Sequence, residues 1–126
     1  MRTVESVYWF GVQILQSRFK EGEVSISQWE PYENEQEDTK KALEAVISYM
    51  KQNDLKYLYG KTNIIILPGY DFKIFSGIVT NFHQPSSTLL LLIAAFIGND
   101  WKMLYEYALK NDFRFLSYGD SSVLFK

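Results

Sequence analysis

The run from Thr88 to Ile97 contains ten consecutive residues without a charged side chain, and it constrains the fold more than any other part of the chain. Pro85 breaks the chain before the run, Ser86 or Ser87 can cap a helix, and Gly98 can end it. A helix that is apolar on all sides must be buried. The run is also far too short to cross a bilayer, which needs about 20 apolar residues. We therefore predict a buried soluble-protein helix over 88–97.

Periodicity and turn residues predict the remaining elements. We expect helices at 3–19, 39–53 and from Asn99 or Asp100 onward, and short strands at 23–29, 62–67, 72–75, 78–82 and within 113–125. Thr3 can cap the first helix and Asp38 or Thr39 the second, while the acidic stretch ending at Asp38 reads as a loop. The predicted inward face of the first helix is Val4, Val7, Tyr8, Gly11, Ile14 and Leu15, and Trp9, Phe10 and Val12 widen it into a mostly buried helix. The predicted inward faces of the others are Ala42, Leu43, Val46, Ile47 and Met50 in the second helix, and Met103, Leu104, Tyr107 and Ala108 in the last. This order predicts an α/β fold, a mixed sheet layered by helices.

Composition limits the kind of protein. A chain of 126 residues favours a single domain over 1–126, and its 47% apolar and 22% charged residues are typical of a globular protein. The absence of cysteine excludes disulfides, thiolate metal sites and a cysteine nucleophile. The N-terminal residues do not resemble a secretory signal, so we expect a cytoplasmic protein without membrane contact.

Charge is unevenly distributed along the chain. Residues 21–38 hold seven acidic side chains and no Lys or Arg, whereas the remaining residues hold eight acidic and thirteen basic ones, a balance of +5. Nucleic acid binding requires positive charge that displaces counterions from phosphates. The acidic segment is therefore a poor candidate for contacting RNA, and the lysines and arginines outside it are better ones, although the sequence does not rank them.

Four stretches resemble the S-adenosylmethionine:tRNA ribosyltransferase-isomerase family. They are MRTVES at 1–6, LPGYDFK at 67–73, TNFHQPSSTLLLLIAAFIG at 80–98 and FRFLSYGD at 113–120, and the third is the most specific. The resemblance implies a partial barrel-like mixed sheet, the C-terminal part of the family's larger α/β domain, without its small β-barrel domain. In the family a Gly-Thr-Thr-Ser turn precedes the Arg-Thr-x-Glu run, so its absence before Met1 suggests a fragment. Ser86 stands where many relatives carry Lys, a charge whose loss weakens any hold on phosphate or carboxylate.

The family's chemistry sets the functional expectation. Members transfer and isomerise the ribosyl group of S-adenosylmethionine onto 7-aminomethyl-7-deazaguanine in tRNA, which yields epoxyqueuosine. The resemblance therefore implies tRNA and S-adenosylmethionine as partners, with S-adenosylmethionine as a substrate, no cofactor and no metal. We expect this fragment to be inactive alone and to self-associate through apolar edges that the missing part leaves exposed.

The matching motifs supply the candidate residues. His83, the only histidine, is the expected base or acid, with Asn81 and Thr80 beside it as hydrogen-bonding groups, although a lone histidine is more often structural. The expected substrate-binding residues lie in the four stretches: Arg2, Glu5, Pro68, Gly69, Tyr70, Ser87, Thr88, Tyr118 and Asp120. Each has a structural alternative, such as helix capping for Ser87 or turn ordering for Asp120.

A different class of function remains open from the sequence. The chain can also be a self-standing small α/β binding or interaction module that uses an aromatic-rich cleft or the acidic loop to hold a partner. Aromatic residues make up 17% of the chain, which supplies such a surface but equally fills a core.

Overall fold

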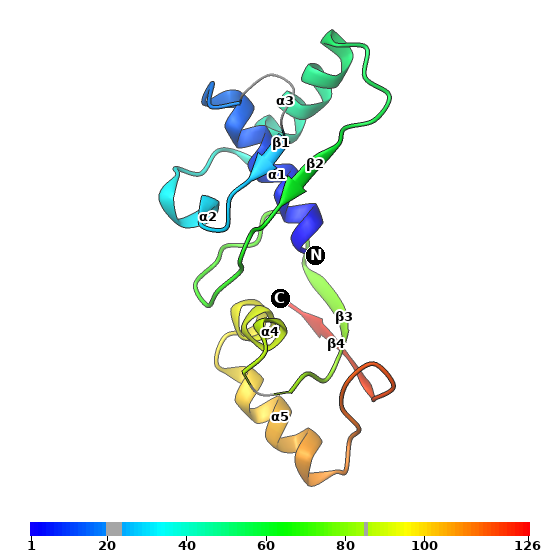
Figure 1. Ribbon diagram of the computed structural model, residues 1–126. Helices are drawn as coiled ribbons and strands as arrows, with labels where there is room; N and C mark the ends of the chain where they lie inside the picture. The colour runs from blue at the N-terminus through cyan, green and yellow to red at the C-terminus, as the bar shows by residue number, and fades with distance from the viewer. Residues whose placement is uncertain (20–23, 85) are drawn as a thin grey trace. The chain divides into compact units, whose positions relative to one another are not determined.

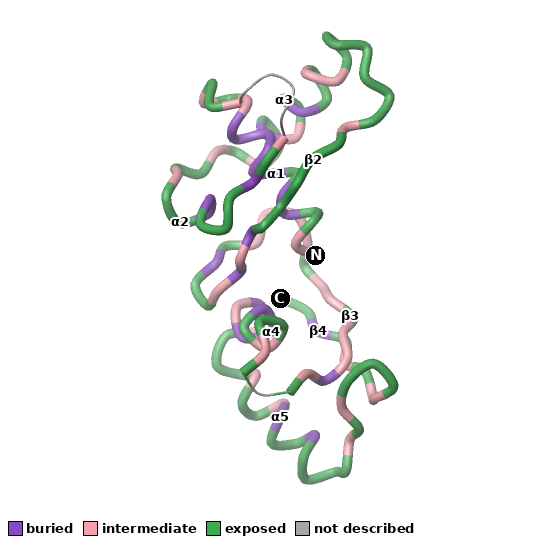
Figure 2. Tube along the Cα trace, in the orientation of Figure 1, coloured by how far each residue is buried: buried purple, intermediate pink, exposed green. Residues whose placement is uncertain are grey.

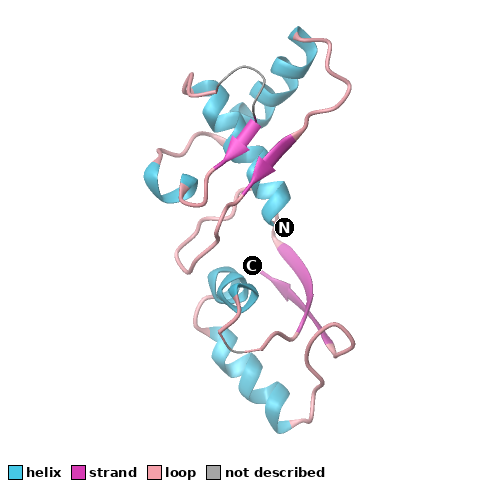
Figure 3. Cartoon of the chain, viewed as in Figure 1, coloured by secondary structure: helices cyan, strands magenta, loops and turns pink. Residues whose placement is uncertain are grey.

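The computed structural model describes residues 1–19, 24–84 and 86–126. Predictions that involve Glu21, Glu23 or Pro85 lie outside the described residues. The chain divides into two compact units, Met1–Ile65 and Ile66–Lys126, and each is described by itself. Helices and short strands occur in both units (Figure 3), so the predicted α/β class is confirmed. The prediction of one partial domain over 1–126 is not tested and stays a prediction.

Two helices dominate the N-terminal unit. Helix α1 (Arg2–Leu15) packs against helix α3 (Thr39–Gln52), as Figure 1 shows. The contact is close because position 11 is glycine: a Cβ there would lie 2.0 Å from the carbonyl oxygen of Ala42. Asp38 caps α3 as predicted, since its carboxylate accepts from the Lys41 N–H at 2.9 Å. On α3 the fully buried apolar residues are Ala42 and Val46, whereas Ile47 is 52% exposed.

Helix α1 differs from its prediction in extent and in the burial of three residues. It begins at Arg2 without a side-chain cap, so Thr3 does not cap it, and it ends at Leu15 rather than residue 19. Tyr8, Trp9, Phe10 and Val12 are buried as predicted, whereas the predicted inward residues Val4, Val7 and Leu15 are exposed. Figure 2 shows this buried stretch along α1. Because α3 and two strands all contact α1, its middle turns are covered on more than one side.

The strands of the N-terminal unit are shorter than predicted. Strand β1 (Val24–Ile26) pairs in parallel with β2 (Gly60–Thr62), in the register Val24↔Gly60. The prediction of a strand over 62–67 was wrong, since β2 ends at Thr62. Backbone bonds nevertheless continue beyond it: the N–H of Asn63 donates to Ile26 at 3.0 Å, and that of Ile65 to Gln28 at 3.1 Å. The chain follows its neighbour there without forming a regular ladder, which the apolar sequence pattern alone does not reveal.

The predicted acidic loop contains a short helix, α2 (Glu30–Glu33). Pro31 stands in its first turn, where its fixed φ favours a helix start and its missing N–H costs no intrahelical bond. The Glu30 side chain is 5% exposed, and its carboxylate accepts a 2.8 Å bond from Arg18. This ion pair offsets the cost of burying the carboxylate.

An antiparallel ribbon forms one part of the C-terminal unit. Strand β3 (Gly77–Asn81) pairs with β4 (Ser121–Phe125), in the register Val79↔Val123. β3 lies within one residue of the predicted strand at 78–82, and β4 is the final strand expected within 113–125. The prediction of a strand at 72–75 was wrong: this stretch is irregular, and its aromatic rings pack against the hydrophobic core instead.

Helices α4 (Thr88–Ile97) and α5 (Asp100–Lys110) form the other part. α4 starts and ends as predicted, with Gly98 at a φ of 62°. It is not buried on all sides, since Leu89 is 44% exposed. On α5 the predicted inward residues Met103 and Tyr107 are 67% and 59% exposed. The buried core consists of Phe82, Ile93, Phe96, Tyr105, Ala108 and Leu124.

The sheets remain small throughout the described ranges. Residues 1–19, 24–84 and 86–126 contain two two-stranded sheets and no barrel-like sheet. Within these same ranges, no individual helix has the length and apolarity to cross a membrane; only α4 and α5 taken together, bent by 118° between them, meet that criterion.

Candidate functional site

The end of strand β3 brings three of the predicted residues together. Thr80 and Asn81 are the last residues of β3, and His83 follows two residues later. The Oγ1 of Thr80 lies 2.9 Å from Nε2 of His83, and it also donates to the Asn81 carbonyl at 3.3 Å. A hydroxyl carries one proton, so when Thr80 donates it to Asn81, the His83 Nε2–H donates to Oγ1 and Nδ1 keeps a lone pair. That nitrogen can then accept a proton from a substrate.

Burial sets the electrostatics of His83. The side chain is half-buried, and desolvation of the charged imidazolium holds the pKa of His83 below its ordinary value. The ring is therefore neutral at neutral pH, the form that a general base requires. Its backbone N–H donates to the hydroxyl of Tyr105 at 3.0 Å, which fixes the residue to helix α5. Burial also raises the pKa of Tyr105, so this phenol stays protonated.

Asn81 connects β3 to the loop at 113–120. Its side-chain Nδ2 donates to the backbone carbonyls of Leu116 at 3.1 Å and Ser117 at 3.3 Å. Its side-chain Oδ1 accepts from the Ser121 hydroxyl at 2.8 Å. The Leu116 N–H donates in turn to Phe82 at 2.9 Å. The side chain of Asn81 is thus occupied with holding this loop, and it acts as a positioning residue.

Asp120 orders the same loop from its other end. Its carboxylate accepts from the Arg114 N–H at 2.7 Å and lies 3.7 Å from the Arg114 guanidinium. Its carbonyl accepts from the Phe82 N–H at 3.3 Å. Asp120 therefore lies in the same hydrogen-bonded cluster as Asn81, while Tyr118, at 96% exposure, projects from the loop.

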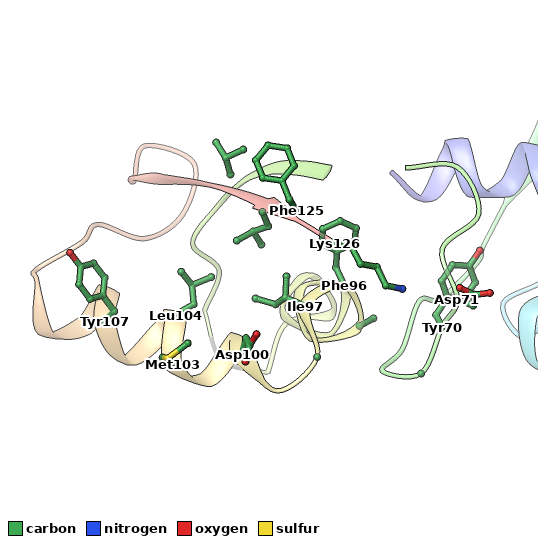
Figure 4. A pocket seen from close by; sticks show the side chains of 15 residues that line it. Tyr70, Asp71, Phe96, Ile97, Asp100, Met103, Leu104, Tyr107, Phe125 and Lys126 are labelled. Carbon is green, nitrogen blue, oxygen red and sulfur yellow. The ribbon is translucent and has the colours of Figure 1, made fainter. Parts of the chain in front are cut away.

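A pocket of about 1020 Å³ lies elsewhere in the C-terminal unit. Figure 4 shows its lining, which includes Gly69 and Tyr70 together with residues of α4, α5 and β4. The lining includes none of Thr80, Asn81 or His83. The predicted residues are therefore not gathered in one cavity of this unit.

Tyr70 and its neighbour Asp71 have different surroundings in that pocket. Tyr70 is 6% exposed, and its ring packs edge-to-face on Phe72 with centroids 5.0 Å apart, which leaves little face for stacking a purine. A 2.6 Å bond from Lys73 holds the pKa of Asp71 below its usual range, and the charge of Lys126 adds to this effect. Figure 4 shows the Lys126 side chain extending toward Asp71.

Ser87 and Thr88 lie at the start of α4. The Ser87 hydroxyl accepts from the Leu90 N–H at 3.2 Å and caps the helix, as its structural alternative predicted. Thr88 is the first residue of α4 and is exposed. Ser86, which replaces the expected Lys, is exposed and has a φ of 66°.

The other predicted binding residues occupy separate positions. Arg2 and Glu5 lie on α1 in the N-terminal unit, where Glu5 is completely buried. Pro68 is exposed beside Gly69, whose φ of 97° suits glycine. The structure thus brings together Thr80, Asn81, His83 and Asp120 from the predicted set.

Two residues of this cluster escaped the sequence analysis. Tyr105 accepts a hydrogen bond from the His83 backbone N–H. It stands three residues before Ala108, and this helical spacing could have placed Tyr105 on the buried face of α5. Leu116 has a φ of 71°, a conformation that leucine rarely adopts, and no sequence signal predicts it. Such strained residues occur often at functional sites. Within the described ranges, no group of three or more His, Cys, Asp or Glu side chains has an arrangement that could hold a metal ion.

Comparison with known proteins reveals one family. A sequence profile described as "Queuosine biosynthesis protein" matches residues 38–124. Three relatives named S-adenosylmethionine:tRNA ribosyltransferase-isomerase are similar to this chain. That of Halothermothrix orenii is 47% identical over 76 residues, 60% of this chain and 22% of the relative. The relative from Legionella pneumophila is 53% identical over 64 residues, which are 50% of this chain and 19% of the relative. The relative from Ruegeria pomeroyi is 42% identical over 84 residues, which are 66% of this chain and 24% of the relative.

A solved structure agrees with these relatives. The crystal structure of S-adenosylmethionine tRNA ribosyltransferase from Thermotoga maritima matches with a TM-score of 0.50 and 40% identity, and the match covers 64% of this chain and 30% of that one. The chain therefore spans less than a third of the length of the proteins that it matches.

Proposed function

Since the chain belongs to the queuosine biosynthesis protein family, we propose that it supplies part of the catalytic domain of an S-adenosylmethionine:tRNA ribosyltransferase-isomerase. The proposed reaction transfers and isomerises the ribosyl group of S-adenosylmethionine onto 7-aminomethyl-7-deazaguanine in tRNA, gives epoxyqueuosine, and releases adenine and methionine. The observation that carries the proposal is the hydrogen-bonded cluster of Thr80, Asn81, His83 and Asp120 inside the region that matches the family.

His83 is the proposed base in this reaction. The positive sulfur of S-adenosylmethionine acidifies the neighbouring ribose carbon, so the site must supply a group that accepts a proton from it. A neutral imidazole held by Thr80, with Nδ1 as the accepting atom, meets this requirement. Asn81 and Asp120 position the 113–120 loop beside β3, which keeps the base and the loop in a fixed geometry.

The remaining expectations belong to the same proposal. The chain corresponds to the C-terminal part of a partial barrel-like domain, acts in the cytoplasm, and lacks activity alone because it spans about a fifth of its relatives' length. S-adenosylmethionine and the modified tRNA are substrates, and no cofactor or metal is expected. The family match favours this proposal over a self-standing binding module.

Calorimetric titration of the full chain with S-adenosylmethionine tests the proposal. We expect weak, saturable binding because part of the site is present. His83→Ala and Thr80→Val should weaken it at least severalfold, whereas Lys40→Ala should not, since Lys40 lies on α3 with 83% of its side chain exposed. Absence of binding at millimolar ligand, or equal affinity in all variants, contradicts the proposal. Release of adenine by the chain alone would contradict its inactivity.

A further inference from the structure

A short segment of the N-terminal unit combines exposed aromatic rings with lysines. Residues 56–61, between α3 and the end of β2, contain Lys56, Tyr57, Tyr59 and Lys61 and no acidic residue. We call these residues the lysine–tyrosine segment. Tyr57 is 62% exposed and Tyr59 is 82% exposed, which is high for such large rings.

The segment is held in place by its alternate residues. Leu58 is half-buried and lines a small pocket of about 160 Å³ together with Phe10 and Val24. Gly60 approaches Val24 so closely that a Cβ would lie 2.6 Å from its side chain. Leu58 is half-buried whereas Tyr57 and Tyr59 on either side of it are exposed, so the anchored residue leaves both rings at the surface. The two rings are therefore presented by an anchored backbone.

The geometry of the rings leaves stacking surface available. Their centroids lie 6.4 Å apart with planes inclined at 51°, and the Nζ of Lys56 lies 5.6 Å from the Tyr57 centroid. Tyr57 is thus partly engaged by a cation–π contact, whereas Tyr59 keeps the more open ring. In the part of the chain that the structure describes, Lys56 and Lys61 take part in none of the observed ion pairs, so their charges face solvent.

We propose that the lysine–tyrosine segment binds unpaired RNA, with Lys56 and Lys61 neutralising phosphates and a base stacked on Tyr59. The proposal rests on the proposed function, because it assigns a contact surface for the tRNA partner. Exposed lysines stand before and after the exposed Tyr59 ring in the sequence of this segment, and single-strand sites combine backbone neutralisation with stacking. Stacking on Tyr59 requires a base that is not held in a duplex, which favours a loop or end.

The test uses the full chain and two RNA probes, an unmodified tRNA transcript and a fully paired RNA hairpin stem. Binding is measured by fluorescence anisotropy over a series of salt concentrations. The variants are Lys56→Ala with Lys61→Ala, Tyr59→Ala, Tyr59→Phe and Tyr59→Leu. Lys40→Ala is the charge control, because Lys40 is exposed and near Glu44 on α3. Circular dichroism checks that each variant is folded.

The expected results separate charge from stacking. The double lysine variant should lower the slope of log affinity against log salt by about 1.4 in magnitude, since each phosphate contact with a single strand contributes about 0.7. Tyr59→Ala and Tyr59→Leu should weaken tRNA binding about tenfold, while Tyr59→Phe should bind like the wild type because it keeps the ring. The paired stem should bind more weakly than the tRNA and should not respond to the Tyr59 changes.

Three outcomes overturn the proposal. If the wild type binds tRNA and all variants bind equally, the RNA site lies elsewhere while the tRNA partner stands. If the wild type binds S-adenosylmethionine but no RNA, this surface is not an RNA site. If the Tyr59 changes alter self-association rather than RNA affinity, the segment contacts a second protein molecule. Loss of S-adenosylmethionine binding with RNA binding intact would instead contradict the proposed function alone.

Discussion

The amide nitrogen of Asn81 donates to the carbonyl of Leu116 at 3.1 Å, and this bond joins residues separated by 35 positions. The acceptor belongs to a leucine with a φ of 71°. A left-handed leucine is strained by roughly 1–2 kcal/mol, so surrounding contacts must stabilise it. From outside the loop, the Asn81 side chain and the Phe82 carbonyl, which accepts the Leu116 N–H at 2.9 Å, both do so.

Replacing Asn81 should loosen the 113–120 loop. Asn81→Ala removes three hydrogen bonds and should cost about 1–2 kcal/mol of unfolding free energy. Asn81→Asp should cost more, because a carboxylate oxygen would then face the carbonyls of Leu116 and Ser117. Denaturant unfolding measures the cost, and amide hydrogen exchange at Leu116 reports loop opening. Asn111→Ala is the control, since its amide makes one exposed bond to Tyr107. Equal stability of the Asp and Ala variants contradicts the prediction.

Adding a methyl group at Gly11 should separate α1 from α3. The new Cβ would lie 2.0 Å from the Ala42 carbonyl oxygen, which is backbone and cannot rotate away. Gly11→Ala should therefore destabilise the protein by about 3 kcal/mol, as overpacking does.

Gly69→Ala is a suitable control for this change. Nothing lies within 4 Å of a Cβ at Gly69, but its φ is 97°, so the cost there comes from backbone strain alone. We expect about 1–2 kcal/mol for it. Thermal unfolding compares the two, and a Gly11→Ala variant no less stable than Gly69→Ala would show that the helices separate easily.

Stability should depend on pH through His83. Burial lowers its pKa in the folded protein, so the unfolded chain takes up the proton more readily. The contribution of neutral His83 to the unfolding free energy is therefore fully present above the ordinary histidine pKa, and it decreases as the pH drops below that value. His83→Gln removes this contribution while keeping a hydrogen-bonding group near Thr80. Because the chain has one histidine, the difference in Tm between about pH 7.5 and pH 5.5 should be smaller in the variant. An unchanged difference would show that His83 is not desolvated.

Self-association should proceed through the outer face of the β3–β4 ribbon. Val79 and Val123 pair across the ribbon and are 72% and 58% exposed, and Phe125 beside them is 75% exposed. An exposed apolar sheet face favours burial against another molecule. We expect dimers or larger species in light scattering at high concentration. Val79→Thr with Val123→Thr keeps the β-branched shape and should shift the protein toward the monomer. A wild-type monomer at every concentration tested contradicts this expectation.

The sequence by itself determined the positions of two helices, α3 and α4. The run at 88–97 and the Asp38 cap are local signals, because a helix closes its hydrogen bonds within a few residues, and both were confirmed. The family match likewise confirmed the resemblance that four motifs indicated.

Tertiary structure decided what depends on distant partners. β2 ends at Thr62 although residues 64–67 are apolar, since a regular strand requires a neighbour that continues the hydrogen-bonded ladder. The sequence predicted a mostly buried α1, but the contacts with α3, β1 and β2 decided that Val4, Val7 and Leu15 stay exposed. The cluster of Asn81, His83 and Asp120 arises because the 113–120 loop folds back onto the end of β3, and Leu116 adopts its left-handed conformation only within that contact.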